Sequence, residues 1–417
     1  MTGRVTMLGM SRWSVEGGSY RTIQRFLGLQ DIPWKEINWS IVDKFLMRFE
    51  KVRILAGDEA TVTKSGKETF GVDRFFSSIQ NQVVPSMCFL CISVISVKHH
   101  RSFPLVMHQL VKDKLRGCSK YRQKQDDNKD SSTTRKDVEA GKRGRKKGSK
   151  NINRRDVKLS KYMQFTQDKI AEVLGMMSKG NSKPTYFLFD GEFGNNFAVQ
   201  MTSRVGLYLI SKLRRGSKLY IPWQGEYSGR GRKRVYGDRF DPKNIPAEYL
   251  ISSEQKDGTL VEMFQVQARH KKFPDALNIV IIRKTKIDSG KVGHVILFSS
   301  DLDLAVDKIV EYYSLRYQIE FNFRDAKQYW GLEDFMVVRE NKVRNSASFS
   351  MFMVNMSYAL IAKNNDKIGQ SVHDLKVWFL ARKQVLSTLK LCSEKTDAIF
   401  IRGLIDQISM KFMVNGI

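Results

Sequence analysis

The chain has 417 residues, of which 41% are hydrophobic and 11% aromatic, so it can fold around a large core and is not an intrinsically disordered protein. Its 71 Lys and Arg residues outnumber its 43 Asp and Glu residues, and the formal net charge of +28 indicates a polyanionic partner such as nucleic acid. Residues 1–12 lack the apolar run of a signal peptide, and the most apolar window, 87–97, is about half as long as a membrane span, so we expect an intracellular protein without a membrane partner.

Residues 1–48 contain short helical patterns separated by Gly and Pro, and we interpret them as a helical DNA-binding region. Residues 19–26 have helical apolar spacing, with Arg21 and Arg25 on one side. This pattern fits the second helix of a helix-turn-helix, which places such side chains in the major groove. It fits an ordinary basic helix equally well, and the sequence does not decide between the two.

A strand is predicted at residues 52–58, where a short apolar run ends at Asp58. The following turn contains Lys64 and Lys67, which either contact DNA or are simply solvated. Further strand-forming segments follow at residues 70–76 and 83–97.

A pair of cysteines, Cys88 and Cys91, lies inside the second of these segments. Their C-x-x-C spacing, with His99 and His100 downstream, superficially suggests a zinc site. Both cysteines stand within an apolar run and the sequence has no second C-x-x-C pair. We therefore interpret them as buried strand residues.

The segment from about residue 120 to 157 is polar and strongly basic, and its composition predicts a disordered loop. Its most basic part contains Arg143 and Arg145 beside Gly residues, as in AT-hook arms that lie in the DNA minor groove. Because Lys146 stands where an AT-hook has Pro, we expect non-specific phosphate contacts here.

Alternating helix and strand patterns resume after this loop. The predicted elements are a helix at 160–177, a buried strand at 185–189 that ends at Asp190, a helix starting near 195, and a strand at 207–213. Between them and residue 300, several runs broken by Gly and Pro predict antiparallel β-structure. These runs lie at 219–223, 234–236, 260–268, 277–284 and 292–298.

A helical pattern begins at residue 303 and continues through residue 327, and further helices are predicted at 336–389. At about 100° per residue, four side chains fall within an arc of roughly 60°: Tyr313, Arg316, Glu320 and Lys327. The adjacent arc is apolar: Leu315, Ile319, Phe323, Ala326 and Trp330. The far side is polar and is expected to face water: Asp307, Glu311, Gln318, Asn322 and Asp325. The strip between the two sides either binds a ligand or forms the intrahelical ion pairs of an ordinary amphipathic helix.

Three carboxylates stand out by position, because Asp58 and Asp190 each close a predicted strand and Glu320 lies on the inner strip of the helix. Strand ends converge at one edge of a sheet, so these residues can meet there. Three such carboxylates can bind two Mg²⁺ ions about 4 Å apart, which together activate an attacking oxygen and stabilise a departing one. Glu59 and Glu192 compete for this role, or support a metal from beyond its direct ligands.

The spacing Tyr-x2-Arg-x3-Glu-x6-Lys, from Tyr313 to Lys327, resembles the signature of IS4-type DDE transposases. The residues around Asp58, including the segment 71–77, are similar to the first-Asp block of IS4-like and IS701-like transposases. Residues 189–193 resemble their second-Asp block, and the likeness extends over about residues 52–345. Two departures are Gly57, before the first Asp, and Ala60, where Thr is common in the family.

The resemblance implies an α/β fold with an RNase H-like catalytic core, a β-rich insertion, and helical regions at both ends. The expected domains are a DNA-binding region at 1–48, the first part of the core at 49–217, the insertion at 218–300, the end of the core with the signature helix at 301–335, and a C-terminal helical region at 336–417.

The resemblance also implies roles for the site residues. Asp58, Asp190 and Glu320 would be the catalytic residues and the ligands of two Mg²⁺ ions, for which Mn²⁺ can substitute. Three side chains of the signature would hold phosphates: Tyr313, Arg316 and Lys327. Trp223 is either the residue that stacks on a flipped base in some relatives or an ordinary core or turn aromatic.

The implied function is that of a transposase of insertion-sequence type, which cleaves transposon ends and joins the 3′-OH to target DNA by two-metal phosphoryl transfer. Its partners would be double-stranded DNA, as terminal inverted repeats and target, and a second copy of the chain on the paired ends. It would act in the cytoplasm at the nucleoid of a prokaryotic-type cell. Two alternatives remain: a catalytically silent DNA-binding protein derived from a transposase, and an RNase H-like nuclease that cuts without joining.

Overall fold

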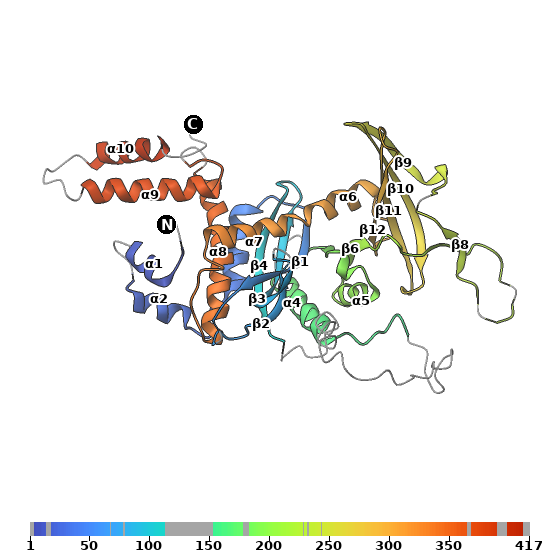
Figure 1. Cartoon of the computed structure of the whole chain (residues 1–417), viewed down its shortest axis with the longest axis horizontal. Helices are drawn as coiled ribbons and strands as arrows, with labels where there is room; N and C mark the ends of the chain where they lie inside the picture. The colour runs from blue at the N-terminus through green and yellow to red at the C-terminus, as the bar shows by residue number, and fades with distance from the viewer. Residues whose placement is uncertain are drawn as a thin grey trace, which may run out of the picture. The chain divides into compact units, whose positions relative to one another are not determined.

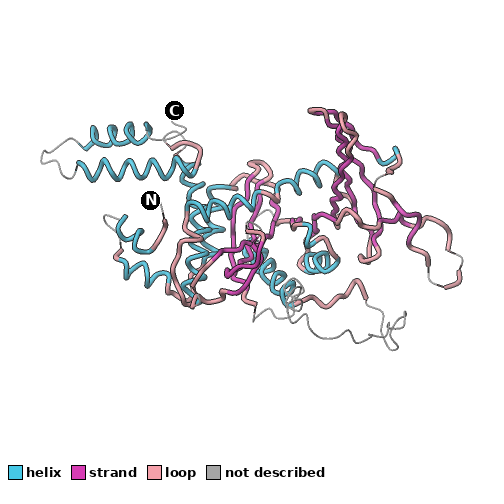
Figure 2. Tube along the Cα trace, in the orientation of Figure 1, coloured by secondary structure: helices cyan, strands magenta, loops and turns pink. Residues whose placement is uncertain are grey.

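The computed structural model divides the chain into two compact units of mixed α/β structure (Figures 1 and 2). Unit 1 comprises Met1–Lys112, Ile170–Asp190 and Val310–Ile417, and unit 2 comprises Asp113–Lys169 and Gly191–Ile309. The described residues are 4–13, 18–66, 68–77, 80–112, 153–177, 183–227, 229–231, 233–242, 244–364, 368–389 and 398–411. Most of the basic segment at 120–157, with Arg143 and Arg145, lies outside them, as does Lys67.

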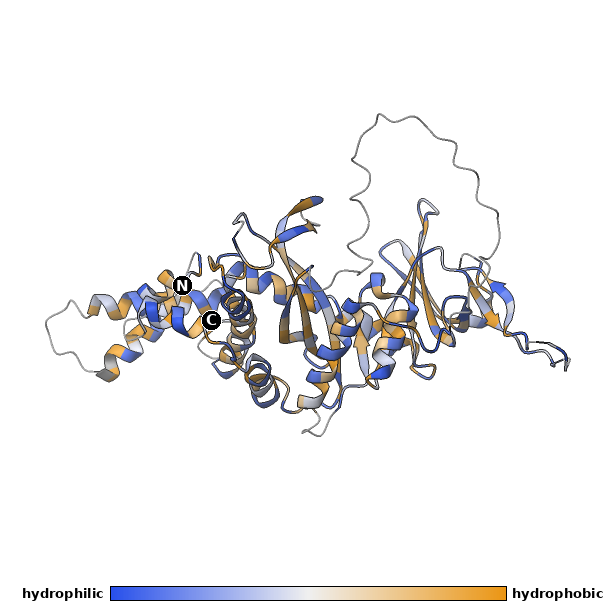
Figure 3. Cartoon of the chain, turned by 90° about the horizontal axis from the view of Figure 1, so that it is seen from below, coloured by the Kyte–Doolittle hydropathy of each residue, from blue (hydrophilic) through white to orange (hydrophobic). Residues whose placement is uncertain are grey.

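The centre of unit 1 is a sheet in which the long strand β3 pairs with three other strands. Its strands are β1 (Arg53–Thr63), β2 (Asp73–Ser77), β3 (Gln82–Ser96), β4 (Arg101–Leu110) and β5 (Tyr186–Leu188). Strand β1 pairs antiparallel with β3 along its whole length and parallel with β5 over three residues. The apolar run in β3 is completely buried, and the hydrophobic colouring follows the central strands in Figure 3. Cys88 and Cys91 are buried in this strand, which confirms the prediction of buried thiols.

Helices cover the β4 side of this sheet, where α3, α7 and α8 all pack against β4 (Figure 1). The helices of unit 1 are α1 (Met7–Trp13), α2 (Tyr20–Leu27), α3 (Trp34–Ile41), α7 (Gln318–Tyr329), α8 (Glu340–Lys363), α9 (Val372–Leu389) and α10 (Ala398–Lys411), with a π-helical turn at Val42–Leu46. The short N-terminal helices and the C-terminal helices agree with the sequence pattern. Within the described residues, none of the helices has the length and apolarity of a membrane span.

The predicted water-facing side is confirmed at Asp307, which is exposed, and is wrong for α7. Asn322 and Asp325 are each only 2% exposed. The Asn322 amide donates to the Ser102 hydroxyl (3.0 Å), and Asp325 accepts a hydrogen bond from the Tyr358 hydroxyl (2.5 Å). Helix α8 supplies Tyr358 and packs against α7, so α7 is buried on two sides and these polar groups bond within the core.

Unit 2 contains the predicted antiparallel block. Its elements are α5 (Asn196–Arg204), β6 (Tyr208–Leu213), β7 (Leu219–Pro222), β8 (Tyr236–Phe240), β9 (Leu250–Lys256), β10 (Thr259–His270), β11 (Ala276–Lys286) and β12 (Val292–Ser299). The strand order is β6-β12-β11-β10-β7-β8, and β9 pairs with the free edge of β10. Asn195 caps α5 by accepting a hydrogen bond from the Ala198 amide, as the predicted helix start requires. The chain passes between the units within α4 (Lys161–Met177) and α6 (Val306–Leu315).

Candidate active site

A groove of ≈ 690 Å³ in unit 1 is lined by all three predicted acidic residues, Asp58, Asp190 and Glu320. Asp58 lies in β1, Asp190 follows β5, and Glu320 lies in the first turn of α7. The parallel register pairs Ala56 with Leu188, so Asp58 and Asp190 each stand two residues beyond the last pair. Parallel pairing therefore delivers two carboxylates to one edge of the sheet, and α7 adds the third.

Asp58 does not close its strand, which corrects the predicted boundary. Strand β1 continues to Thr63, because β3 is long enough to pair with it from Asp58↔Cys91 to Thr63↔Ser86. What ends before Asp58 is the pairing with β5. Asp58 is thus held by β3 on one side and faces the groove where β5 no longer covers the edge.

The signature segment is not one continuous helix. Helix α6 ends at Leu315 and α7 begins at Gln318. Across the break the backbone makes i→i+3 bonds, such as Arg316 N–H to the Tyr313 carbonyl (3.2 Å), and the Ser314 hydroxyl donates to the Glu311 carbonyl (2.6 Å). Serine bonds of this kind compete with regular helix. The single-helix arc was therefore wrong, although Arg316, Glu320 and Lys327 still line the groove.

Arg316 joins two of the three carboxylates. Its Nη1 lies 3.2 Å from Asp58 Oδ2 and its Nη2 lies 3.1 Å from Glu320 Oε1. The Arg316 side chain is 15% exposed and Asp58 is 22% exposed, so the contact with Asp58 is partly shielded from water, whereas Glu320 is 42% exposed. Across the part of the chain that the structure describes, no three His, Cys, Asp or Glu side chains are close enough to hold a metal ion. In this arrangement Arg316 supplies the positive charge between Asp58 and Glu320.

Burial raises the pKa of Asp58 from its ordinary 3.8 to about 6. Arg316 and the Glu59 amide, which donates to Asp58 Oδ1 (2.8 Å), both lower this pKa, whereas the charges of Asp190 and Glu320 raise it. The desolvation and the neighbouring carboxylates together outweigh the single guanidinium. Burial therefore favours the protonated form of Asp58 in spite of the adjacent guanidinium.

Gly57, one of the departures from the family pattern, has a packing reason. A Cβ at this position would lie 2.8 Å from Phe187 Cζ and 3.0 Å from Phe189 Cε1. Both rings are fully buried, and their centroids are 4.9 Å apart. The space beside Gly57 is thus filled by two rings, Phe187 of β5 and Phe189, which precedes Asp190.

We expect Gly57→Ala to destabilise unit 1 by about 1–3 kcal/mol, the usual cost of overpacking a core. Any catalysis by the groove should weaken as well, because Asp58 follows Gly57 and Asp190 follows Phe189, whose ring the new methyl group would displace. Urea unfolding of the purified protein measures the first effect. Gly175→Ala is the matched control: its Cβ meets nothing within 4 Å and stands in α4, so stability should be unchanged or slightly higher.

Lys327 and Lys64 are engaged with the segment after α7. Lys327 Nζ donates to the Thr61 carbonyl (2.9 Å) and pairs with Glu333 (3.0 Å). Lys64 Nζ donates to the carbonyls of Glu333 (2.7 Å) and Phe335 (2.8 Å), and burial lowers its pKa to about 8. Lys64 is therefore not a freely solvated turn residue.

Glu333 lines the groove but was not predicted from the sequence. Gly331, with φ of 75°, ends the helix in the left-handed region and turns the chain back toward Lys327. The Trp330-Gly331 pair is the sequence signal for that turn, although it does not reveal which side chain will meet Lys327. Other lining residues absent from the prediction are Ser77, Thr61, Arg324 and Gln328.

The other predicted residues have varied surroundings. Tyr313 is half-buried in α6, and burial raises its pKa while Arg316 lowers it. Trp223, in unit 2, is 38% exposed and carries the Arg234 guanidinium 3.9 Å above its ring. Arg21 and Arg25 are exposed on α2. Of the competing carboxylates, Glu59 lines the groove and accepts from Cys88 Sγ (3.6 Å), and Glu192 lies in a 3₁₀ turn at Gly191–Phe193.

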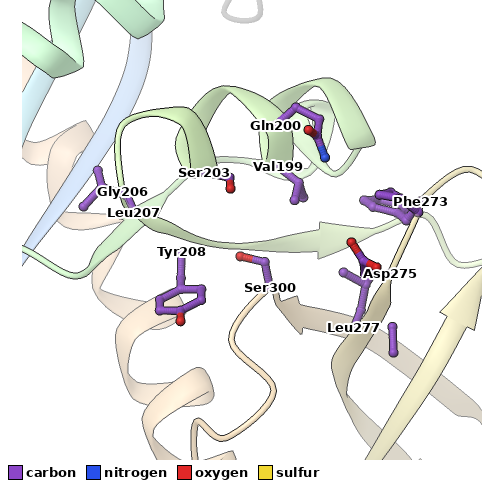
Figure 4. A pocket seen from close by; sticks show the side chains of 12 residues that line it. Val199, Gln200, Ser203, Gly206, Leu207, Tyr208, Phe273, Asp275, Leu277 and Ser300 are labelled. Atoms are coloured by element: carbon purple, nitrogen blue, oxygen red, sulfur yellow. The ribbon is translucent and has the colours of Figure 1, made fainter. Parts of the chain in front are cut away.

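A second cavity, of ≈ 330 Å³, lies within unit 2 between α5 and the strands β6 and β11 (Figure 4). Its single carboxylate, Asp275, is paired with Arg155 at 2.6 Å. The other polar side chains labelled in Figure 4 are those of Gln200, Ser203, Tyr208 and Ser300. This cavity lacks the clustered acids of the groove, which remains the candidate catalytic site.

Comparison with known proteins agrees with this geometry. A family model described as DDE superfamily endonuclease matches residues 1–269. The matched part contains Asp58 and Asp190 and ends before Glu320. A search of the curated proteins found no significant match. Because the family model covers more than half of the sequence, the chain belongs to the DDE superfamily endonucleases.

Proposed function

We propose that this protein is a DNA transposase of the IS4/IS701-like group, which cleaves transposon ends and joins the freed 3′-OH to target DNA. Family membership by itself implies a DNA substrate and a nuclease- or transposase-type activity. The observation that carries the finer proposal is the groove in which Asp58, Asp190 and Glu320 meet Arg316 and Lys327. All five side chains belong to the two Asp blocks or to the signature, and of the four signature residues only Tyr313 does not line the groove.

The topology supports an RNase H-like core with an insertion. The unit 1 sheet contains an antiparallel β1–β3 pair and a β1–β5 pair that is parallel, with α7 and α8 packed on the β4 side. The antiparallel sheet of unit 2 lies between Asp190 and Glu320 in the sequence, where the family carries its β-rich insertion.

The residues of the groove fit divalent cations in their chemistry. Carboxylate oxygens are the ligands that Mg²⁺ prefers, and the groove is lined by three carboxylates that come from separate elements. Asp58, Asp190 and Glu320 would hold Mg²⁺, with Mn²⁺ as a substitute, once the guanidinium of Arg316 leaves them. Bound there, the ions would polarise the scissile phosphate and lower the pKa of the attacking water or 3′-OH.

The basic side chains of the groove would then grip the DNA. Arg316 is well suited to a phosphate, because its planar fork can form two charge-assisted hydrogen bonds. Lys327 now pairs with Glu333 and would exchange that carboxylate for a phosphate. Tyr313 adds a half-buried hydroxyl beside Arg316. Other proposed DNA contacts are Lys64, Lys67, Trp223, Arg21, Arg25, Arg143 and Arg145.

Arg316→Ala is expected to separate metal binding from catalysis. Without DNA, the variant should bind Mn²⁺ about 10-fold more tightly, since the guanidinium no longer competes for Asp58 and Glu320. Cleavage should fall by about 10²-fold, the usual effect of losing one donor to developing charge. Electron paramagnetic resonance measures free Mn²⁺, and a nicking assay measures cleavage. Arg316→Lys keeps the positive charge but not the planar fork, so its Mn²⁺ affinity and its cleavage rate should lie between those of the unchanged protein and Arg316→Ala. Weaker Mn²⁺ binding by Arg316→Ala would contradict the proposal that Arg316 and the metal ions compete for the same carboxylates.

The proposed function is tested by incubating the purified protein with DNA that carries the inverted repeats flanking its gene, together with Mg²⁺ and a target plasmid. End-specific nicking followed by strand transfer is the expected result. Binding without cleavage would favour a silent DNA-binding protein, and cutting without joining would favour an RNase H-like nuclease. Assembly of two copies on paired ends would appear as a 2:2 complex in light scattering.

A further inference from the structure

Two phenylalanine rings project into solvent just before β1. Phe45 is 61% exposed and Phe49 is 81% exposed, although Phe is normally among the buried residue types. Their neighbours Val42 and Met47 are buried and anchor the segment in the core. Because buried residues on the same segment hold it in place, the backbone keeps both phenylalanine rings in solvent.

The same corner of unit 1 is strongly basic. Its exposed residues come from the π-helical turn, from residues 48–51 that follow it, and from the β3–β4 connection: Lys44, Phe45, Arg48, Phe49, Lys51, Lys98, His99 and His100. We name this set the Phe45–Phe49 corner. A small pocket of ≈ 280 Å³ lies within it. Both phenylalanines line this pocket, and its charged or titratable lining residues are Lys44, Arg48, Glu50, Lys98 and His99.

The acidic residues of this region do not neutralise the corner. Asp43 is paired with Arg53 at 2.8 Å. Glu50 is 8% exposed and accepts from the Ser96 hydroxyl (2.8 Å) and the Lys98 amide (3.0 Å). Glu50 therefore satisfies internal donors, and Asp43, although 42% exposed, is paired with a buried guanidinium. The outer surface combines four Lys or Arg side chains with two aromatic rings, and the Arg48 guanidinium stands 5.4 Å from the Phe49 centroid.

The positive charge and the exposed rings of the Phe45–Phe49 corner together indicate which kind of partner binds there. A second copy of the chain would bring the same positive corner and repel it, and an apolar protein partner would not use the cations. Nucleic acid offers phosphates for the cations and flat base faces for the rings. In a duplex those faces are covered by neighbouring bases, so only an unpaired strand exposes them.

We propose that the Phe45–Phe49 corner binds an unpaired DNA strand, with bases stacked on the two phenylalanine rings and phosphates held by Lys44, Arg48 and Lys98. The corner is separate from the catalytic groove: Arg53, at the start of β1, precedes Asp58 by five residues, or about 17 Å along a strand. Binding at the corner does not require cleavage, and so it stands independently of the proposed function.

The test measures fluorescence anisotropy of the full chain with a labelled oligo(dT) and with a duplex of equal length. Phe45→Ala/Phe49→Ala should bind oligo(dT) about 10- to 100-fold more weakly, as expected for the loss of stacked bases, and should bind the duplex within about twofold of the unchanged protein. Phe45→Leu/Phe49→Leu keeps apolar side chains without π-faces and should be nearly as weak. Phe379→Ala removes another exposed ring, 40% exposed on α9, and should have no effect.

The cations have their own readout. Lys44→Ala/Arg48→Ala/Lys98→Ala should lower the slope of log Kd against log salt for oligo(dT) by about two, at roughly 0.7 per lost phosphate contact. Circular dichroism checks that each variant is folded. Unchanged oligo(dT) affinity in the double Phe variant would overturn the proposal, as would an equal loss on duplex. Loss of binding to phosphatidylserine vesicles with no loss on oligo(dT) would instead identify a membrane contact. Asp58→Ala should bind oligo(dT) normally even if it does not cleave.

Discussion

Glu320→Gln is expected to abolish cleavage of end-containing DNA, with a loss of about 10³-fold or more, since metal-assisted charge stabilisation contributes several kcal/mol. Glutamine keeps the shape of the side chain and can still accept from Arg316 Nη2, so the fold of α7 should persist. Asp58→Ala and Asp190→Ala should have the same effect on cleavage. DNA binding should be unchanged or slightly tighter, because each substitution removes a negative charge that repels phosphate. A gel-based nicking assay and a filter-binding assay measure the two properties.

Glu59→Gln is the matched control for this series. Glu59 lines the same groove and adjoins Asp58, yet it bonds to Cys88. If the three acids are correctly assigned, this variant should cleave at close to the normal rate. Normal cleavage by Glu320→Gln would show that α7 does not supply the third ligand, and loss of cleavage in Glu59→Gln alone would move the first ligand by one residue.

Asp58→Asn should stabilise the metal-free protein at pH 8. The pKa of Asp58 in the folded protein is raised to about 6, so folding favours the protonated form. Its unfavourable contribution is absent well below pH 3.8, grows as the pH rises from 3.8 to about 6, and is complete above about 6. The rise from 3.8 to about 6 corresponds to at most about 3 kcal/mol, at 1.36 kcal/mol per pH unit. Asparagine removes this cost, and its expected gain in unfolding free energy is roughly 1–3 kcal/mol.

Urea titrations without divalent ions at pH 8 and at about pH 3, below both pKa values of Asp58, measure this effect. The variant should be more stable than the unchanged protein at pH 8 and equal to it at about pH 3. Asp31→Asn alters an exposed carboxylate of unit 1 and should change neither value. Mg²⁺ should raise the stability of the unchanged protein and leave Asp58→Asn nearly unaffected. Equal stability of both proteins at pH 8 would mean that Arg316 fully compensates the buried charge.

Two strands show where local patterns fail. Strand β4 contains Pro104, which weakens a local strand pattern. Among the described residues β4 pairs only with β3, so it lies at an edge of the sheet, where Pro is tolerated, and the register shifts between Ile92 and Ser93 to leave one residue of β4 unpaired beside that proline. Strand β9 is exposed along nearly its whole length, so it has no apolar alternation to detect. Both strands form because a longer neighbouring strand supplies backbone hydrogen-bond partners: β3 pairs with β4, and β10 pairs with β9.

The interior of unit 1 shows the same limit for single residues. The apolar side of α7 follows from its 3.6-residue period, and Ile319 and Ala326 are fully buried as that period predicts. The burial of Asn322 and Asp325 does not follow from it, because the groups that bond them come from β4 and α8. Asn322 and Asp325, whose polarity predicts a solvent-exposed side of the helix, instead form hydrogen bonds in the core.

The sequence by itself determined the family resemblance, the apolar strands β1 and β3, and the choice of Asp58, Asp190 and Glu320 as candidate catalytic residues, because residue types, short spacings and hydrophobic periods are local properties. Only the tertiary structure decided that these acids share one groove, that Arg316 bridges two of them, that Glu333 pairs with Lys327, and that two phenylalanines stand in solvent among cations. Each of those facts depends on which distant segments pack together, and packing is set by the burial of the whole chain rather than by the order of neighbours along it.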